Sequence, residues 1–551
     1  MFRLQKALQN NPVHYPSNRI FRVWIRGGVL FTLLALVLLP IVAAWAQYLI
    51  NGLPPIAPNL SSLPQGFPVW IRLAHYANLL FIVLLMRSGL SILMDHPRLY
   101  WNVHCTPGSQ WARLTPLDIP TDRVWTAKDD ARYISPLFAL PGYRHTVGTA
   151  RHWHFPTALL FVGNGLIFIL LAFVTQHWIR LVPSTWDVFS NAWAYFVHYV
   201  TLHMPPEPNG FYSYNGLQQL SYFTVIFIMA PLSFLTGLAM SPAIDNHFPW
   251  YARLFGNRQA ARSFHFLLLL GYLGFTTVHV LMVILTGFTR NMNHIVLGTD
   301  SLNPLGLTLG FAGIGSIILL CYLAHWCSWN YPRALQSASE AVVGSLMRLY
   351  FNPLIPSSEY SKKDISPRFW PNGKMPTSEE WKRLADGGFK DYHLRIYGLV
   401  EKPIELSLDD IKAFGKKEQT TLHHCIQGWS GIAEWGGLPM SKVVELVRPL
   451  PEARIAVFRS FGEGLFGGEY YDTQLMVNLH HPQTILAYEM NGKPLGLVYG
   501  APVRLRVENQ LGYKMVKWIK SIEFVTASER VGKGFGGKNE DDEYFDLIPN
   551  I

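Results

Sequence analysis

Charged residues and cysteine are both scarce in this sequence. Only 15% of its 551 residues are charged, whereas 50% are hydrophobic and 14% aromatic. The four cysteines have neither the spacing of a disulfide framework nor that of a zinc site. The formal charge of +10 is better explained by basic residues that flank apolar runs than by nucleic acid binding, because such residues orient membrane spans.

The composition divides the chain into two halves. Nearly all long apolar runs precede residue 330 and most charged side chains follow it, so we predict a membrane domain fused to a soluble one. The expected parts are a transmembrane domain over 1–330, a linker over 331–366 and a soluble domain over 367–551. The last part has about 185 residues, enough to bury a core of its own.

Six apolar segments are each near the length of about 20 residues that a helix needs to cross a bilayer. They lie at 24–50, 69–94, 156–179, 217–240, 263–288 and 304–327. Residues 1–23 contain neither a small-residue cleavage site nor a twin-arginine export motif, so we expect no leader to be removed.

Basic residues alternate between the two sides of the membrane. Lys and Arg number five in the N-terminal arm up to Arg26, seven in 95–155 and three in 241–262. The loops 51–68, 180–216 and 289–303 hold none, one and one. The positive-inside rule therefore predicts that both chain ends, and with them the soluble domain, lie on the cytoplasmic side of a bacterial inner membrane.

Two histidines lie in the fifth apolar segment, SFHFLLLLGYLGFTTVHVLMVILTGF. His265 and His279 are 14 positions apart, about 21 Å along a helix and within roughly 40° of the same face. One helix could therefore carry two stacked metal centres, one near each membrane surface. The alternative is that both are ordinary polar side chains in a bundle, although an intramembrane ionisable residue is by default a candidate for function.

Depth in the membrane predicts a partner for each of these histidines. His75 begins the second span from the outer side, and His154 lies at the cytoplasmic start of the third. We predict an inner pair, His154 with His265, and an outer pair, His75 with His279, each suited to a six-coordinate haem iron. His152 competes with His154, which lies further into the apolar run.

Three runs in this half resemble a known family. RHWHFPTALLFVGNGLIF, LSYFTVIFIMAPLSFLTGLAMSPA and RSFHFLLLLGYLGFTTVHVLMVILTGF are similar to the bacterial dihaem b-type cytochromes that serve nickel-iron hydrogenases, formate dehydrogenases and thiosulfate reductases. The resemblance covers about 69–290. It implies a four-helix haem core, two b haems and electron exchange with a membrane quinone.

The soluble part is predicted to mix helices and strands. Alternation in HLRIYGLV predicts a strand, and SLDDIKAF predicts a helix with Ser407 as its N-cap. The runs ARIAVFRSF, APVRLRVEN and KWIKSIEFV predict further strands.

A lone cysteine, Cys425, stands in the segment TTLHHCIQGWSGIAEWGGLP. Such a residue is commonly a small buried hydrophobe. Here a predicted strand leads to the thiol and several glycines follow it, which lets backbone close around a group held at the thiolate. A soft thiolate favours a soft metal centre without indicating which one.

Four basic residues follow in YGAPVRLRVENQLGYKMVKWIKSIEFV, namely Arg504, Arg506, Lys514 and Lys517. Together they carry enough positive charge to hold a phosphate or pyrophosphate. The alternative is a solvated pair of basic strands.

These two segments resemble the molybdenum-cofactor domain of the sulfite oxidase family, which includes the bacterial catalytic subunit that reduces protein methionine sulfoxide. The resemblance rests on HHCIQGWSGIAEWGGLP and on YGAPVRLRV with GYKMVKWI, and covers about 365–530. It implies that Cys425 ligates molybdenum and that Arg504 and Lys517 contact the pterin phosphate, with Asn372 and His424 lining the pocket. No arginine pair follows the cysteine, which argues against sulfite as substrate.

The sequence thus predicts a helical transmembrane bundle of about six spans, followed by a mixed α/β molybdopterin domain. The expected function is a membrane-bound oxidoreductase that connects a small oxo-acceptor or oxo-donor substrate, molybdenum, two haem b groups and quinone or quinol. Electrons could run in either direction. The competing hypothesis is a non-enzymatic membrane carrier or proton relay with a ligand-binding soluble domain.

Overall fold

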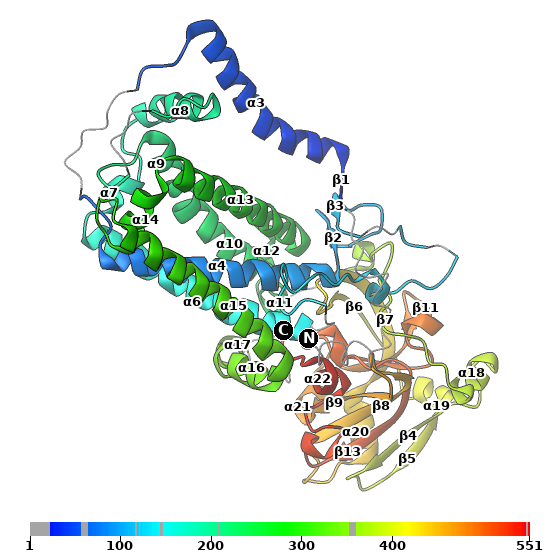
Figure 1. Cartoon of the computed structure of the whole chain (residues 1–551). Helices are drawn as coiled ribbons and strands as arrows, with labels where there is room; N and C mark the ends of the chain where they lie inside the picture. The colour runs from blue at the N-terminus through cyan, green and yellow to red at the C-terminus, as the bar shows by residue number, and fades with distance from the viewer. Residues whose placement is uncertain are drawn as a thin grey trace.

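Helices form the N-terminal half of the chain and strands the C-terminal half (Figure 1). The computed structural model describes residues 23–56, 64–115, 118–120, 122–143, 147–205, 210–351, 360–546 and 549–551. This arrangement confirms the predicted fold class, an all-helical transmembrane bundle followed by a mixed α/β domain.

Six helical segments in the described residues are long and apolar enough to cross a membrane. They are α3 (Gly27–Asn51), α4 (Val69–Asp95), α6 (Val147–Val174), the continuous α9, η1 and α10 (Gly216–Phe223, Thr224–Met229, Ala230–Met240), α13 (Arg258–Leu285) and α15 (Pro304–Asn330). At most 22% of the apolar window of any of them is buried within the protein, which leaves broad apolar faces for lipid. The predicted number of spans is confirmed.

The third span begins nine residues earlier than the hydropathy pattern predicts, at Val147 instead of residue 156. The added turns are more polar than the rest of the helix, and Pro156 follows them inside it. They are buried against the C-terminal domain instead of lipid; a Cβ on Gly148, for example, would lie 2.5 Å from the Tyr544 carbonyl oxygen. His154 therefore lies two turns inside α6.

Short helices connect the spans or follow the last one. They are α5 (Ala127–Asp130), α7 (Trp178–Leu181), α8 (Asp187–Val200), α11 (Pro242–His247), α12 (Pro249–Arg253), α14 (Phe288–Val296), α16 (Pro332–Ser339), η2 (Glu340–Gly344) and α17 (Ser345–Phe351). The loop after α4 contains β2 (Arg98–Leu99) and β3 (Ala112–Arg113), and β3 also pairs with β1 (Trp24–Ile25), which precedes α3. The predicted linker thus starts as helix, and its residues 352–359 lie outside the described part.

Two five-stranded sheets form the C-terminal domain. The first contains β6 (Lys417–His424), β7 (Ser430–Pro439), β10 (Ile485–Met490), β11 (Lys493–Pro494) and β12 (Arg504–Arg506). The second has the order β5 (Ile404–Ser407), β4 (His393–Gly398), β13 (Ile519–Val525), β8 (Ile455–Glu463), β9 (Glu469–Leu475). The helices that cover them are α18 (Glu379–Asp386), α19 (Leu408–Ala413), α20 (Met440–Val447), α21 (Met476–Leu479) and α22 (Lys538–Glu543). Ser407 caps α19 through the amide of Asp410, as predicted.

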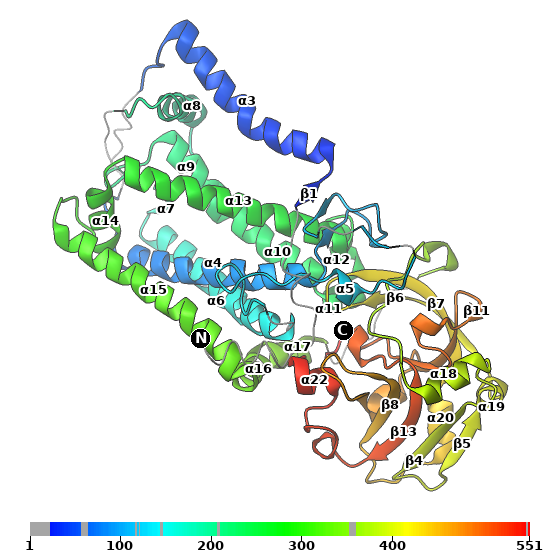
Figure 2. The same ribbon diagram turned by 45° about the vertical axis from the view of Figure 1, so that its right-hand side comes forward.

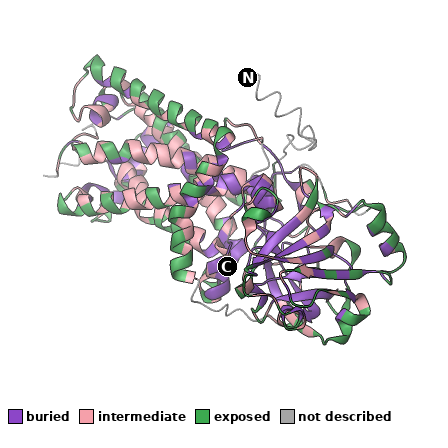
Figure 3. Ribbon diagram, turned by 90° about the horizontal axis from the view of Figure 1, so that it is seen from below, coloured by how far each residue is buried: buried purple, intermediate pink, exposed green. Residues whose placement is uncertain are grey.

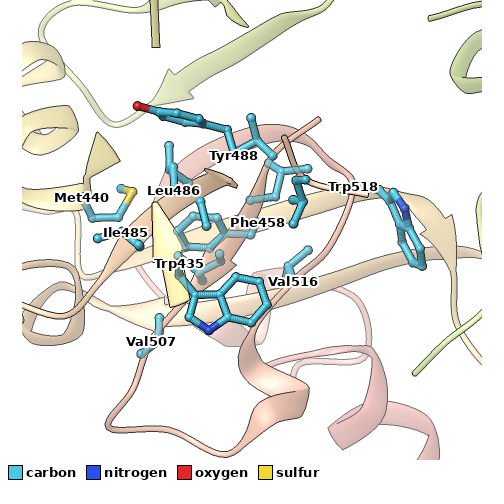
Figure 4. Close-up of a cluster of buried hydrophobic side chains, with 14 of the residues drawn as sticks. Trp435, Met440, Phe458, Ile485, Leu486, Tyr488, Val507, Val516 and Trp518 are labelled. Atoms are coloured by element: carbon cyan, nitrogen blue, oxygen red, sulfur yellow. The ribbon is translucent and has the colours of Figure 1, made fainter. Parts of the chain in front are cut away.

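One hydrophobic core joins these two sheets. Figure 4 shows Trp435 of β7, Phe458 of β8 and Leu486 of β10 in the same cluster of buried side chains. The burial pattern in Figure 3 follows this division, because the strands are largely buried while the outer faces of the long helices are exposed. The C-terminal domain therefore has the core of a water-soluble domain, and the bundle does not.

The C-terminal domain lies at one end of the helical bundle (Figures 1 and 2). The loop between α4 and α6 enters its core, where Tyr100 and Trp125 pack among the domain's own apolar side chains. That loop is held by a fully buried ion pair between Arg98 and Asp130, at 2.7 Å. The ends of the spans that the charge pattern assigns to the cytoplasm are thus the ends that meet the soluble domain.

Candidate functional site

The bundle brings its four candidate histidines together as two facing pairs. The ring centroids of His75 and His279 are 6.3 Å apart, and those of His154 and His265 are 6.4 Å apart. These are the pairs that membrane depth predicts. We call His154 and His265 the inner pair, because they lie nearer the C-terminal domain, and His75 and His279 the outer pair.

The spacing within each pair fits a single metal ion held between two imidazoles. A metal–nitrogen bond to histidine is about 2 Å and the ring centre lies about 1 Å beyond the nitrogen, so two opposed ligands place their centroids about 6 Å apart. Within the described residues, no three His, Cys, Asp or Glu side chains gather as they would around a bare metal ion. Two protein ligands suit haem, whose porphyrin supplies the other four.

Hydroxyl groups orient the inner pair. Nδ1 of His154 lies 3.0 Å from the Ser88 hydroxyl, and Nδ1 of His265 lies 3.0 Å from the Thr236 hydroxyl. Each ring is thereby held by one nitrogen, which leaves Nε2 for a metal. His152, the competing candidate, instead has its Nε2 3.0 Å from the Tyr544 carbonyl oxygen.

The thiol of Cys425 lies at the start of a tight turn between β6 and β7. The Gly428 amide donates to the Cys425 carbonyl at 2.9 Å, and the Cys425 amide donates to the Trp429 carbonyl at 3.2 Å. Gly428 has a φ of +103°, a conformation that a residue with a side chain rarely adopts. We call residues 425–429 the cysteine turn.

A cavity of about 120 Å³ opens beside this turn. Cys425, Asn372, Arg504 and Lys517 all line it. Nε of Arg504 is buried with no hydrogen-bond partner, and Nζ of Lys517 donates only to the carbonyls of Asn372 and Val498. Neither cation forms an ion pair with an acidic side chain among the residues that the structure describes, so the site fits an anionic group such as a pterin phosphate.

Burial controls the electrostatics of this cavity. It raises the pKa of the Cys425 thiol to about 12, and a metal ion bound at the sulfur would favour the thiolate. Burial, assisted by Arg504, lowers the pKa of the Lys517 ammonium well below its usual value, and burial next to Arg506 lowers that of Arg504. A bound anion would reverse both downward shifts, because it would stabilise the charged forms.

Two predicted site residues lie outside this cavity. His424 points toward the membrane domain, with Nε2 4.0 Å from the Asp245 carboxylate. Lys514 forms ion pairs with Asp472 and Glu540, and all three side chains are buried. Its positive charge is therefore already neutralised within the protein.

The buried position of Lys514 leads to a prediction about stability. Lys514→Met should destabilise the protein by about 3–5 kcal/mol, because it leaves two buried carboxylates without their counter-charge. The matched control is Lys416→Met, since Lys416 pairs with Glu489 at the surface and is 39% exposed. Solvent screens such a pair, so its loss should change stability far less. Thermal unfolding of the purified variants checks this, and equal shifts for the two would contradict the structural role of Lys514.

The cavity also contains residues that the sequence interpretation missed. His423 lines it in place of its neighbour His424, because side chains alternate along β6 and position 423 shares a face with 425. Gln427 lines it from the cysteine turn, with Oε1 3.8 Å from the Cys425 sulfur. Lys128 comes from α5, in a loop between two membrane spans, and no sequence signal ties it to the cavity.

Two family models match this chain. Prokaryotic cytochrome b561 matches residues 66–296, and the oxidoreductase molybdopterin binding domain matches residues 382–531. The first range contains all four paired histidines, and the second contains Cys425, Arg504 and Lys517. The chain is thus a multi-pass membrane protein that joins a cytochrome b domain to a molybdopterin-binding domain.

Relatives of the C-terminal half include the protein-methionine-sulfoxide reductase catalytic subunit MsrP of Campylobacter jejuni, 29% identical over 173 residues, which are 29% of this chain and 58% of that protein. MsrP of Xanthomonas campestris pv. campestris is 33% identical over 144 residues, which are 24% of this chain and 45% of that protein. The chain thus spans about half the length of these two proteins. The uncharacterized oxidoreductase YuiH of Bacillus subtilis is 30% identical over 169 residues, covering 30% of this chain and 82% of YuiH. The chain therefore belongs to the family of oxidoreductases with a molybdopterin-binding domain, here fused to a membrane domain of the prokaryotic cytochrome b561 type.

Proposed function

We propose that this protein is a membrane-bound molybdenum-dependent oxidoreductase that exchanges electrons between an oxo-substrate, two haem b groups and the quinone pool. The observation that carries the proposal is the presence, in one chain, of a thiol-lined cationic cavity and two stacked histidine pairs. One histidine of each pair lies on α13, which begins next to the cysteine turn. The two kinds of site are thereby placed in sequence along one helix.

The residues of the cavity have separate roles in this proposal. Cys425 would bind molybdenum through its thiolate, while Arg504 and Lys517 would bind the pterin phosphate. Asn372, whose amide lies 3.8 Å from the Cys425 sulfur, would orient that ligand. When bound, the cofactors supply oxo transfer with two electrons at molybdenum and single-electron transfer at each haem iron.

The histidine pairs would hold the haems at two depths. The inner pair receives or donates electrons on the side of the cavity, and the outer pair lies near the opposite membrane surface. The depth of the outer pair suits electron exchange with a lipid-soluble quinone, because a quinone could approach this pair from within the bilayer. The protein positions these groups and excludes water from them.

We further propose that the substrate is a sulfoxide and that quinol is the electron source. The printed names of the MsrP relatives support this direction, and so does the absence of an arginine pair after Cys425. Each turnover would take two electrons and two protons, and would convert the sulfoxide to a sulfide with release of the oxygen as water. Oxidation of a substrate such as sulfite is the reverse direction.

A haem spectrum can test both directions in one sample. Protein reduced with a short-chain quinol should show haem oxidation when methionine sulfoxide is added anaerobically, with methionine formed in equal amount to the quinol consumed. Reduction of the oxidised haems by sulfite, with no response to sulfoxide, would show that the direction is reversed. No response to either, in protein loaded with both cofactors, would contradict the proposed substrate class.

The soluble domain is proposed to lie in the cytoplasm, following the distribution of basic residues. A green fluorescent protein fused after Ile551 should therefore fluoresce, and alkaline phosphatase fused there should be inactive. Fusions within loop 289–303 serve as the matched control and should behave in the opposite way. Active phosphatase after Ile551 would place the soluble domain outside.

A further inference from the structure

The cysteine turn rests directly on the first turn of α13. Nε2 of Gln259 donates to the Gly428 carbonyl at 2.9 Å and lies 3.0 Å from the Ser430 hydroxyl. Gln259 is fully buried, and its Oε1 has no hydrogen-bond partner among the described residues. Its amide is thus held by the bonds it makes to the cysteine turn and to the strand that follows.

The membrane domain supports both sides of this contact. The side chain of Asn257 caps α13 by accepting from the amides of Gln259 and Ala260. Arg258 donates to the Gly428 carbonyl at 3.2 Å, and Gln427 donates to the Asp95 carbonyl at 3.3 Å. The cysteine turn therefore has a defined place on the bundle.

The same helix leads from this contact to the inner pair. His265 follows Gln259 by six positions (265 − 259), about 9 Å along the helix axis. Hydrogen bonds from Gln259 and Arg258 thus join the turn that contains Cys425 to the helix that carries His265. The path along α13 from Gln259 to His265 is less than two helical turns.

A second set of polar contacts joins the halves through residues outside the cysteine turn. The chain after α22 lies along α6 and α16, where Arg151 pairs with Asp546 at 3.3 Å and Gln336 donates to the Phe545 carbonyl at 2.6 Å. This contact leads toward His154. It borders the cavity through Phe545, which packs in one hydrophobic cluster with Ile426.

We propose that Gln259 is a positioning residue for electron exchange between the molybdenum site and the inner haem. It fixes the distance between the cysteine turn and α13. Each electron-transfer step between the two sites would move one electron across this contact. Two such steps would supply the two electrons that reduce one substrate molecule, and quinol is the source of these electrons. The proposal rests on the proposed function and adds the route that the electrons take.

Two contacts with the same chemistry allow a matched comparison. Gln259→Leu removes the donor to Gly428, and Gln336→Leu removes the donor to Phe545; both glutamines are buried and both bond a backbone carbonyl across the interface. The Gln259 variant should fold, because the Gly428 carbonyl keeps Arg258 and the Ser430 hydroxyl keeps the Val103 carbonyl. Gln259→Glu provides a second variant of the same shape, which lacks the donor when its carboxyl group is ionised.

The experiment follows haem oxidation by stopped flow after methionine sulfoxide is mixed with the quinol-reduced holoenzyme. Gln259→Leu and Gln259→Glu should slow it several-fold, because electron transfer between two centres slows steeply as the distance between them grows. Haem content, molybdenum content and haem potentials should stay at the wild-type values. Hydrogen exchange in residues 425–429 should rise in both variants, and Gln336→Leu should change neither readout.

The outcomes separate this inference from the proposed function. If wild-type haem is not oxidised by the substrate, the proposed function fails regardless of Gln259. If wild-type haem is oxidised but the Gln259 variants match Gln336→Leu in rate, the proposed role of Gln259 is wrong. A slower rate in Gln336→Leu alone would assign the route to the C-terminal contact instead.

Discussion

Cys425→Ser is expected to abolish turnover while both haem signals remain at wild-type intensity. The variant removes the thiolate that would bind molybdenum, because a serine hydroxyl is a far harder ligand and stays protonated. The histidine pairs lie in the bundle and do not contact this residue. Turnover with quinol and sulfoxide, measured beside the reduced haem spectrum, checks the expectation.

A second cysteine provides the control for this experiment. Cys105 is fully buried and contacts Ser430, next to the cysteine turn, but it does not line the cavity. Cys105→Ser should therefore retain turnover and molybdenum. Activity retained in Cys425→Ser would rule out a molybdenum ligand at this position.

His279→Ala is expected to remove one haem of the two, and His75→Ala to remove the same one. Their ring centroids are 6.3 Å apart, so both would ligate a single iron, and loss of either axial ligand frees that haem. The reduced spectrum and the extracted haem of each purified variant measure the result.

The inner pair gives the complementary result. His154→Ala and His265→Ala should both lose the other haem and leave the outer one, with its spectrum and potential unchanged. If His75→Ala and His279→Ala removed different haems, the assignment of these histidines to one site would be wrong.

Most of the fold could be predicted from local patterns. Runs of apolar residues give the six spans, because hydropathy over some 20 residues is a property of the sequence alone. The start of α6 could not be predicted in this way. Its first turns are polar because they pack against the chain near Tyr544, almost 400 positions away.

Local patterns also predicted part of the candidate site, and the rest depended on the fold. Cys425 stood out through the glycines around it, and the histidine pairs through their depth in the membrane. Strand alternation counted back from Cys425 would have favoured His423 over His424. Lys514 has the positive charge expected of a phosphate-binding residue, but only the fold reveals that it already pairs with Asp472 and Glu540.

Contacts between the domains had no signal in the sequence. Lys128 and Gln259 belong to the membrane half, yet one lines the cavity and the other holds the cysteine turn. Both depend on how two separate domains dock. Composition and periodicity describe each domain by itself and contain no information about that docking.

The central claim is that one chain holds a molybdenum site and two haem sites. The most direct test is elemental analysis for molybdenum and a dithionite-reduced haem spectrum on the same detergent-solubilised preparation. The account predicts one molybdenum and two b-type haems per chain. Protein with neither haem nor molybdenum would contradict it and favour the carrier or proton relay, and haem without molybdenum would reduce the C-terminal half to a ligand-binding domain.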